Sequence, residues 1–331
     1  MIKFAPTKLG LRLLNQSSLI LFAGVLLLFG LLSPVFFQPA NAVNILIQTS
    51  STGILAVGMT FVLLTAGVDL SVGSIMFVTA AVGGKLILGG WSLPAVLLVM
   101  LGIGVLYGAL NALFITRLAI LAFIVTLATR YFGRGLGLHI TETRAMNLPE
   151  AFYQLGAARI IGVPLPVLIF GAVVLAAHVT LTRTPFGRQI YAVGADVEAA
   201  RKAGINTRTV LFAVYVICGF CAAVAGIVSL SQAPTVSPGF GNNREFMAIA
   251  AAVLGGTSLF GGRGTVLPGT VLGAVLIQTI ENGLNILNVN PYLYPLITSG
   301  VIFVAVLLDA VRSRVLARVN RRRIFVEPEA A

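Results

Sequence analysis

Apolar runs separated by short polar stretches fill most of this 331-residue sequence. A helix needs about 20 apolar residues to cross the roughly 30 Å hydrocarbon layer of a membrane. By this criterion the pattern predicts about ten spans and an all-α, polytopic integral membrane protein whose membrane domain covers residues 18–312. The spans are expected near residues 18–37, 45–65, 71–90, 92–114, 119–139, 163–181, 209–231, 245–261, 265–286 and 292–311.

The composition supports this interpretation and excludes two classes of protein. The chain is 58% hydrophobic and 10% charged, whereas soluble domains average about a quarter charged residues. A water-soluble globule of this length cannot hide so much apolar surface. The formal charge is +12, but the basic residues sit at the ends of apolar runs and do not form one patch. This distribution indicates a lipid bilayer as the surroundings and no nucleic acid as partner.

The distribution of lysine and arginine also predicts an orientation. With the amino terminus inside, most basic residues fall on the cytosolic side, and an even number of spans places both termini there. Residues 1–17 then form a short cytosolic segment, residues 313–331 form a basic cytosolic tail, and residues 142–162 and 232–243 face outward. A cleaved signal peptide is the alternative for the amino terminus, but its apolar run of about 20 residues exceeds the usual 7–15.

One long polar stretch, residues 182–208, interrupts the apolar pattern between two hydrophobic blocks. Within it Asp196 is placed to begin a short helix, and Gly204 is placed to end it. Small residues framed by charges suit a groove on another protein. We therefore expect this cytosolic loop to bind a soluble partner that supplies energy, the alternative being an ordinary solvated loop.

Two glycine-rich turns occupy comparable places in the two halves of the chain, and each is followed by a span that holds a Leu-Asn step. This weak internal repeat matters because paired, interrupted apolar segments often mark a transport site. In the first turn, Asp69 and Ser71 could cap the helix that begins near Val72, at the cytosolic edge. That structural role is preferred to contact with cargo. The candidate gate residues in the two turns are Gly67, Asp69, Ser71, Gly73, Gly261, Gly262 and Gly264.

Polar side chains inside the predicted spans are candidates for a translocation pathway. Amides and hydroxyls suit an uncharged, polyhydroxylated cargo, because each cargo hydroxyl both donates and accepts hydrogen bonds. Hydrogen bonding between helices is an equally good explanation of any one of them. Arg130 and Arg134 lie one turn apart in a span and need carboxylate partners, for which Glu245 and Glu281 are available. The candidate pathway residues are Asn111, Gln278, Asn282, Asn285 and Glu245.

The sequence shows no arrangement that predicts an enzyme. Gly256 and Gly261 have the spacing of a phosphate-binding loop, but Gly262 stands where that motif requires lysine. Cys218 and Cys221 could be a redox or metal pair, but two small packing residues inside an apolar run are the better interpretation. We therefore expect no metal, no cofactor and no ATP hydrolysis by this chain.

Four segments of the chain resemble the permeases of bacterial monosaccharide importers of the ATP-binding cassette (ABC) class, of the ribose, xylose and arabinose type. The resemblance covers roughly residues 18–312 and rests on AVGMTFVLLTAGVDLSVGS (56–74), AFIVTLATRYFGRG (122–135), TPFGRQIYAVGADVEAARKAGIN (184–206) and AIAAAVLGGTSLFGGRGTVLPGT (248–270). It implies a pore in the bacterial inner (cytoplasmic) membrane, formed with a second permease. A homodimer is favoured, and a heterodimer remains open.

The resemblance also implies two ABC ATPase domains or subunits on the cytosolic face and a periplasmic sugar-binding protein outside. The coupling helix of the family corresponds to about residues 194–205, and the residues expected to couple to the ATPase are Gly194, Asp196, Glu198, Ala199, Ala200, Arg201 and Gly204. The sequence departs from the family pattern at Ala66, Ala195 and Met247, and the last change puts the identity of the sugar in doubt. An ion-coupled transporter or a stand-alone facilitator of small polar solutes is the alternative function.

Overall fold

The computed structural model describes residues 17–300, 303 and 307. The predicted cytosolic segment 1–17, except its last residue, the basic tail 313–331 and most of the carboxyl-terminal half of the expected span 292–311 lie outside the described residues. The chain divides into two compact units, Phe37–Gln278 and a smaller one that combines Met1–Phe36 with Thr279–Ala331.

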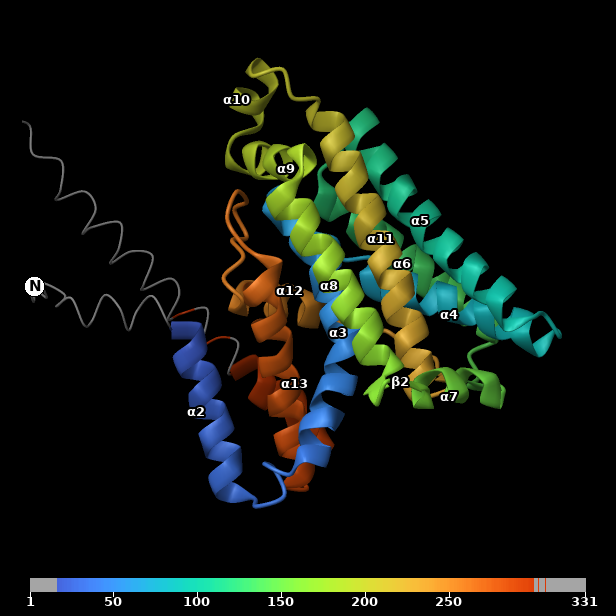
Figure 1. Cartoon of the computed structure of the whole chain (residues 1–331). Helices are drawn as coiled ribbons and strands as arrows, with labels where there is room; N and C mark the ends of the chain where they lie inside the picture. Colours follow the sequence, from blue (N-terminus) through green and yellow to red (C-terminus); the bar gives the residue numbers. More distant parts are fainter. Residues whose placement is uncertain (1–16, 301–302, 304–306, 308–331) are drawn as a thin grey trace, which may run out of the picture. The chain divides into compact units, whose positions relative to one another are not determined.

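Helices build the larger unit. Along the chain they are α3 (Pro39–Leu64), α4 (Val72–Leu88), α5 (Leu93–Arg117), α6 (Ala122–Thr141), α7 (Glu150–Ala157), α8 (Leu165–Arg183), α9 (Pro185–Ala195), α10 (Val197–Lys202), α11 (Thr207–Gln232), α12 (Arg244–Leu254), η1 (Val266–Thr270) and the first half of α13 (Val271–Ile286). Figure 1 shows α9 and α10 at one end of this unit and α7 at the other, with α8 and α11 running from end to end.

Within the described residues, α3, α5, α8 and α11 are long and apolar enough to cross a membrane, while α4 is a shorter apolar helix. They match the expected spans 45–65, 92–114, 163–181, 209–231 and 71–90 to within a few residues, apart from the start of α3. That helix begins six residues early, because Pro39 sits at its first turn, where proline is well tolerated. The prediction of an all-α membrane protein is thus confirmed at the level of fold class.

The core forms around α11, which packs against α5 and α3. Small residues allow this approach: a Cβ at Gly58 of α3 would overlap Cys218 and Cys221 of α11, and one at Gly104 of α5 would overlap Gly219. Both cysteines are free and buried. Their predicted role as packing residues is confirmed, since small side chains are what lets neighbouring helices meet backbone to backbone.

The expected span 245–261 is wrong. The helix there, α12, has 11 residues and is about 16 Å long at 1.5 Å per residue, half the thickness of the hydrocarbon layer. Its first residue, Arg244, donates to Thr52 Oγ1 at 3.0 Å, and Thr52 lies near the middle of α3. The helix therefore begins level with the middle of α3 and ends at Gly255, near the end of α3 that carries Leu64.

The expected span 265–286 is helical along most of its length, but its start is irregular, and its crossing of the membrane stays a prediction. It begins as η1, in which Leu267 has non-helical dihedral angles, and continues as α13. The span follows α3 in the opposite direction: Thr60 and Thr270 share a hydrogen bond of 2.7 Å, and Gln278 Nε2 donates to Gln48 Oε1 at 3.0 Å.

The stretch 142–162, predicted to lie outside the membrane, contains α7 and short strands. β1 (Met146–Asn147) pairs antiparallel with β4 (Thr235–Val236), and β2 (Arg159–Ile160) pairs with β3 (Val163–Pro164). These strands have two residues each and are the exceptions to helix among the described elements. They tie the segment between α6 and α8 to the segment after α11.

The smaller unit contains α2 (Ser17–Leu32), the end of α13 and η2 (Pro291–Leu293). Helix α2 matches the start of the expected span 18–37, which ends early because turn residues follow Leu32. Phe29 of α2 packs against Gly283 of α13, where a Cβ would overlap the aromatic ring, and against Phe36.

Candidate coupling and translocation site

The polar stretch 182–208 folds as the helices α9 and α10, joined at a sharp corner. Asp196 has an extended backbone, and its Oδ1 accepts hydrogen bonds from the backbone N–H groups of Glu198 at 2.9 Å and Ala199 at 3.0 Å. These bonds cap the start of α10. Gly204, with φ of +82°, follows the end of the same helix. Both predicted ends of the short helix are confirmed.

The surface of this segment carries part of the predicted coupling set. Asp196, Glu198, Ala199, Arg201 and Gly204 are exposed, and Glu198 and Arg201 form an exposed ion pair at 3.2 Å. A shallow hollow beside them is lined by Arg201, Ile205, Asn206, Thr207 and Arg208. The exposed face of α10 therefore carries charged side chains around Ala199, and its binding to a partner stays a prediction.

Two members of the predicted coupling set are placed differently. Ala200 is buried, and Gly194 is buried against the carbonyl oxygen of Leu64, where a Cβ would overlap it. The expectation that the small residues of this helix are exposed is wrong at these two positions, which pack the coupling segment onto its own chain. Their part in coupling to the ATPase stays a prediction.

Three segments that are far apart in the sequence meet beneath α9. Gly194 lies on the carbonyl group of Leu64 at the end of α3, and the same carbonyl accepts a hydrogen bond from the backbone N–H of Gly262 at 2.9 Å. Gly261, with φ of +81°, lies against Ala66. We call this contact of residues 194, 64–66 and 261–262 the three-segment joint. It connects the coupling segment to both glycine-rich turns.

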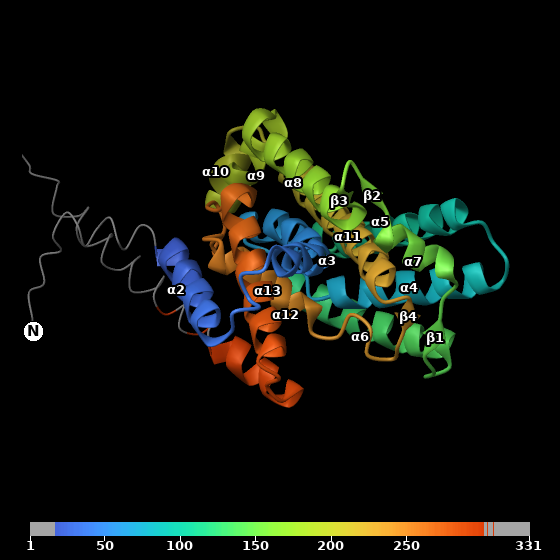
Figure 2. The same cartoon turned by 60° about the horizontal axis from the view of Figure 1, so that its bottom comes forward.

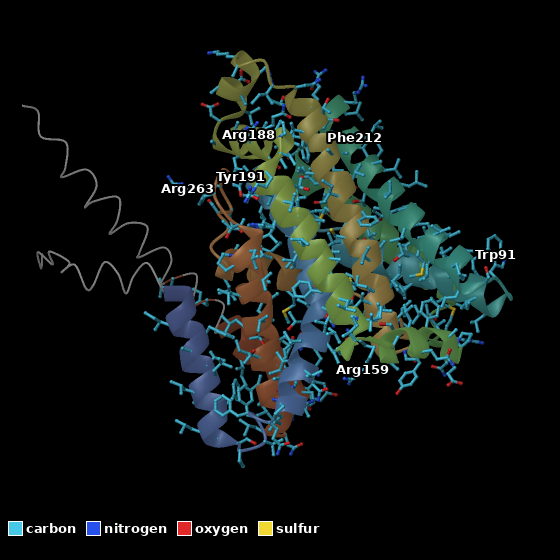
Figure 3. The ribbon with its side chains drawn as sticks, in the orientation of Figure 1. Trp91, Arg159, Arg188, Tyr191, Phe212 and Arg263 are labelled. Atoms are coloured by element: carbon cyan, nitrogen blue, oxygen red, sulfur yellow. The ribbon has the colours of Figure 1, made fainter. Side chains whose placement is uncertain are left out.

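A tyrosine reinforces the joint. The Tyr191 hydroxyl donates to the carbonyl oxygen of Gly264 at 2.8 Å. Burial raises the pKa of Tyr191 above its ordinary value, so the hydroxyl stays protonated and remains a donor. Figure 3 shows Arg188, Tyr191 and Arg263 gathered at this end of the unit. The sequence pattern singled out the glycines but not Tyr191.

The chain runs from the joint at residues 64–66 to Asp69, which is in the interior. Asp69 is 0% exposed, and its Oδ1 accepts from the backbone N–H of Ser71 at 2.8 Å and from Ser71 Oγ at 2.6 Å. Asn111 Nδ2 of α5 donates to the same Ser71 Oγ at 2.8 Å. Asp69 therefore fixes the turn before α4, and the prediction that it caps the helix itself is corrected.

Asp69 lies away from the surface of the helix bundle, and its predicted position at the cytosolic edge of the membrane stays a prediction. The carbonyl group of its neighbour Val68 accepts from the hydroxyl of Tyr215 at 3.5 Å. Tyr215 lies eight residues after Thr207, the first residue of α11, which corresponds to about 12 Å along the helix. The turn thus lies well inside the bundle.

The candidate pathway residues belong to both compact units and have different surroundings. Asn111 and Gln278 are buried and hold helices together through Ser71 and Gln48. Asn282 is buried in the smaller unit, whereas Asn285 is exposed. The two asparagines of the proposed repeat, at 111 and 285, therefore have different surroundings.

The fifth candidate, Glu245, is the partner of Arg130. Its Oε1 lies 2.6 Å from Arg130 Nη2, with side chains 2% and 21% exposed, respectively. Of the two carboxylates available in the sequence, the structure thus pairs Glu245 with Arg130. Arg134 instead donates to the carbonyl oxygens of Phe240 and Pro238, at 2.5 and 3.1 Å, and to the side-chain oxygen of Asn242. Sequence reasoning missed this use of backbone acceptors.

Comparison with known proteins identifies the family. Residues 41–307 match the family described as "Branched-chain amino acid transport system / permease component". This chain belongs to that permease family. No solved structure matches it.

Its curated relatives match over nearly their whole length. The chain is 40% identical to the ribose import permease protein RbsC of Escherichia coli (strain K12), over 90% of this chain and 94% of that protein. It is 39% identical to the ribose import permease protein of Bacillus subtilis (strain 168), covering 87% and 90%. It is 36% identical to the D-allose transport system permease protein AlsC of Escherichia coli (strain K12), covering 89% and 91%.

Proposed function

We propose that this chain is the pore-forming permease subunit of an ATP-driven importer for a monosaccharide. The family description names branched-chain amino acids, but the three relatives above are permeases for ribose or D-allose. The observation that carries the proposal is the coupling segment. Helix α10 exposes a polar face, while the preceding helix α9 is held to the rest of the chain through the three-segment joint. A partner bound to α10 can therefore move the interior of the permease.

The mechanism follows the contacts inward. A displacement of α9 shifts Gly194 against the carbonyl group of Leu64 and against Gly261–Gly262. The backbone from Leu64 continues to Asp69, whose bonds to Ser71 fix the start of α4. Packed contacts without room for a side chain transmit such a shift because they resist compression. The two states of the pore would differ in the position of the turn before α4.

The same proposal extends to orientation and partners. Two permeases, two ATPase domains and a periplasmic sugar-binding protein would form the importer in a bacterial inner membrane, with α9 and α10 in the cytosol. The homodimer is our proposal for the pore. The relatives support a permease role, and the lack of a phosphate-binding loop in the sequence supports a separate ATPase.

Reconstituted transport tests the proposal. The permease is purified with its ATPase and placed in vesicles with the binding protein, and the uptake of D-ribose, D-allose and D-xylose is measured. We expect uptake of at least one sugar that requires both ATP and the ATPase. Uptake that continues without the ATPase would instead support a facilitator, and uptake driven by a proton gradient would support a secondary transporter.

A further inference from the structure

A group of polar and aromatic side chains lies where α6 meets the start of α12. Arg130 and Glu245 form its base, and Arg134 holds the loop that leads into α12. Figure 2 shows this loop, between β4 and α12, running along α6. Asn242 and Asn243 at the end of the loop are exposed.

Three independent contacts place this group at middle depth. Arg130 and Arg134 lie eight and twelve residues after the first residue of α6, near the centre of that 20-residue helix. Arg244, next to Asn243, bonds to Thr52, which is thirteen residues after the start of α3 and twelve before its end. Gly241 lies against Gly73 at the start of α4, a helix that begins inside the bundle. The exposed amides are therefore not on an outer loop.

Lipid cannot cover such a group well. Hydrocarbon offers no hydrogen bonds to exposed amides, and polar side chains at this depth face protein or a water-filled space. Aromatic rings flank the amides and the ion pair: Tyr131 is 68% exposed and Phe246 is 51% exposed, and the Arg130 guanidinium lies 5.9 Å and 5.5 Å from their ring centroids. Apolar walls with a few fixed polar groups are typical of small-molecule sites.

The charges in the base indicate which class of ligand fits. Arg130 and Glu245 neutralise each other at 2.6 Å. Arg134 already donates to two carbonyl oxygens and to Asn242. This leaves amides and ring faces rather than a free charge, and amides both donate and accept. An uncharged, polyhydroxylated molecule can form hydrogen bonds with these amides in both directions, because each of its hydroxyl groups also donates and accepts.

We propose that this face of α6 and α12, formed by Tyr131, Asn242, Asn243 and Phe246 over the Arg130–Glu245 pair, is a contact site for the sugar inside the membrane. The inference rests on the proposed function and adds a location to it. Of the pathway residues suggested by the sequence, the proposed site includes Glu245.

Thiol labelling in the purified permease–ATPase complex tests the site without requiring transport. The native cysteines are both buried, so the unaltered chain gives a low background. Asn243→Cys is treated with a charged, membrane-impermeant thiol reagent, with and without D-ribose, D-allose or D-xylose. Phe220→Cys is the matched control, because Phe220 is an exposed apolar residue of α11.

We expect Asn243→Cys to react, Phe220→Cys not to react, and a transported sugar at ten times its Kd to slow the reaction about tenfold. Labelling that no sugar slows would overturn the proposal, because the face would be wet but not a sugar site. No labelling would overturn it too. In that case a disulfide between two copies would assign the face to the permease–permease interface, and none would assign it to lipid.

A kinetic variant separates this inference from the proposed function. Asn243 has φ of +59°, which glycine adopts without strain, so Asn243→Gly removes the amide but keeps the backbone. Loss of one hydrogen bond to the sugar should raise the KM of ATP-driven uptake about tenfold. An unchanged KM in a complex that transports normally would refute the site but leave the importer standing. Failure of the unaltered complex to transport would refute the importer, and the labelling result would still be readable.

Discussion

At the scale of single residues, the absence of a side chain is what the coupling segment depends on. Gly194 has a helical backbone at the end of α9, so it is not there for a turn. A Cβ at this position would overlap the Leu64 carbonyl group and the backbone of Gly262. Glycine is required here because two backbones approach each other, and a sequence pattern cannot distinguish that reason from a turn.

Gly194→Ala should therefore separate the backbones that meet in the three-segment joint. Overpacking against a backbone costs about 1–3 kcal/mol, and we expect a lower Tm of the purified permease and less sugar taken up per ATP hydrolysed. Gly171→Ala is the control, because a Cβ there, in α8, would meet nothing within 4 Å. It should be neutral or stabilising by up to about 1 kcal/mol. Equal effects of Gly194→Ala and Gly171→Ala on Tm and on sugar uptake per ATP would contradict the close backbone contact at Gly194.

The coupling helix shows what residue-level prediction could and could not reach. Its start at Asp196 and its end at Gly204 follow from local chemistry and were predicted. The burial of Ala200 was not, because six residues are too few for a periodic pattern to show which face points inward. The packing of α10 against α9 and α11 decides that question.

At the scale of elements, α10 offers a matched pair of positions for testing partner binding. Ala199 is exposed and Ala200 is buried, one residue apart on the same helix. Ala199→Trp should leave Tm unchanged while the ATPase no longer copurifies, because the bulk lies on the docking face. Ala200→Trp should lower Tm, at a cost of about 1–3 kcal/mol. Normal copurification with Ala199→Trp would exclude this face as the docking surface.

The element-scale misprediction was α12, which the apolar pattern extended across Gly255 and Gly256. Local hydropathy measures how apolar a stretch is, not whether it turns back halfway. The turn is set by contacts from distant elements: Gly255 packs on Gly269, and Gly262 bonds to Leu64. The charged start of α12 was nevertheless visible in the sequence as Arg244 and Glu245.

The ion pair between α6 and α12 should anchor this half-length helix. Removing one partner of a buried pair leaves an uncompensated charge, at a cost of about 3 kcal/mol. We therefore expect Glu245→Gln and Arg130→Met each to lower Tm substantially, and the double variant Arg130→Met/Glu245→Met to lower it by less than the sum of the two single changes. Additive losses would mean that the pair is not coupled.

The exposed pair of Lys85 and Glu142, at 3.2 Å, is the control for this experiment. Its hydrogen bond to Lys85 lowers the pKa of Glu142. A carboxylate with a lowered pKa contributes stability above its ordinary pKa, and loses that contribution only as pH falls through the lowered value. At pH 7 the pair is therefore ionised, and Glu142→Gln should still leave Tm nearly unchanged, because exposed ion pairs are weak.

At the scale of the whole molecule, the sequence predicted the fold class and most long helices. It could do so because the length of an apolar run is set by the membrane, a local and uniform constraint. The predicted site fared differently. The glycine turns and the coupling segment do meet. Asn111 and Gln278 of the predicted pathway hold helices together, and the sequence could not show this because amides that bind cargo and amides that hold helices look alike in a sequence.

Orientation is the whole-molecule prediction that most needs measurement. Ile161, 98% exposed at the turn between β2 and β3, should lie outside the cell, and Glu198 of α10 should lie inside. Single cysteines at these positions, treated with an impermeant reagent in intact cells, should react at 161 alone. After the membrane is opened, both should react. Labelling of Glu198→Cys in intact cells would rule out an ATPase bound to α10.

The shortness of α12 has a consequence for how the chain is made. A segment of about 16 Å cannot leave the insertion machinery sideways as a stable unit, particularly with Arg244 and Glu245 at its tip. We infer that the ribosome must deliver η1 and α13 before α12 settles, so that both enter the bilayer as one hairpin. In a chain truncated after residue 262, a cysteine introduced within residues 244–254 should react with a membrane-impermeant thiol reagent, and in a chain truncated well after residue 290 the same cysteine should be protected. The opposite result would show that α12 inserts by itself.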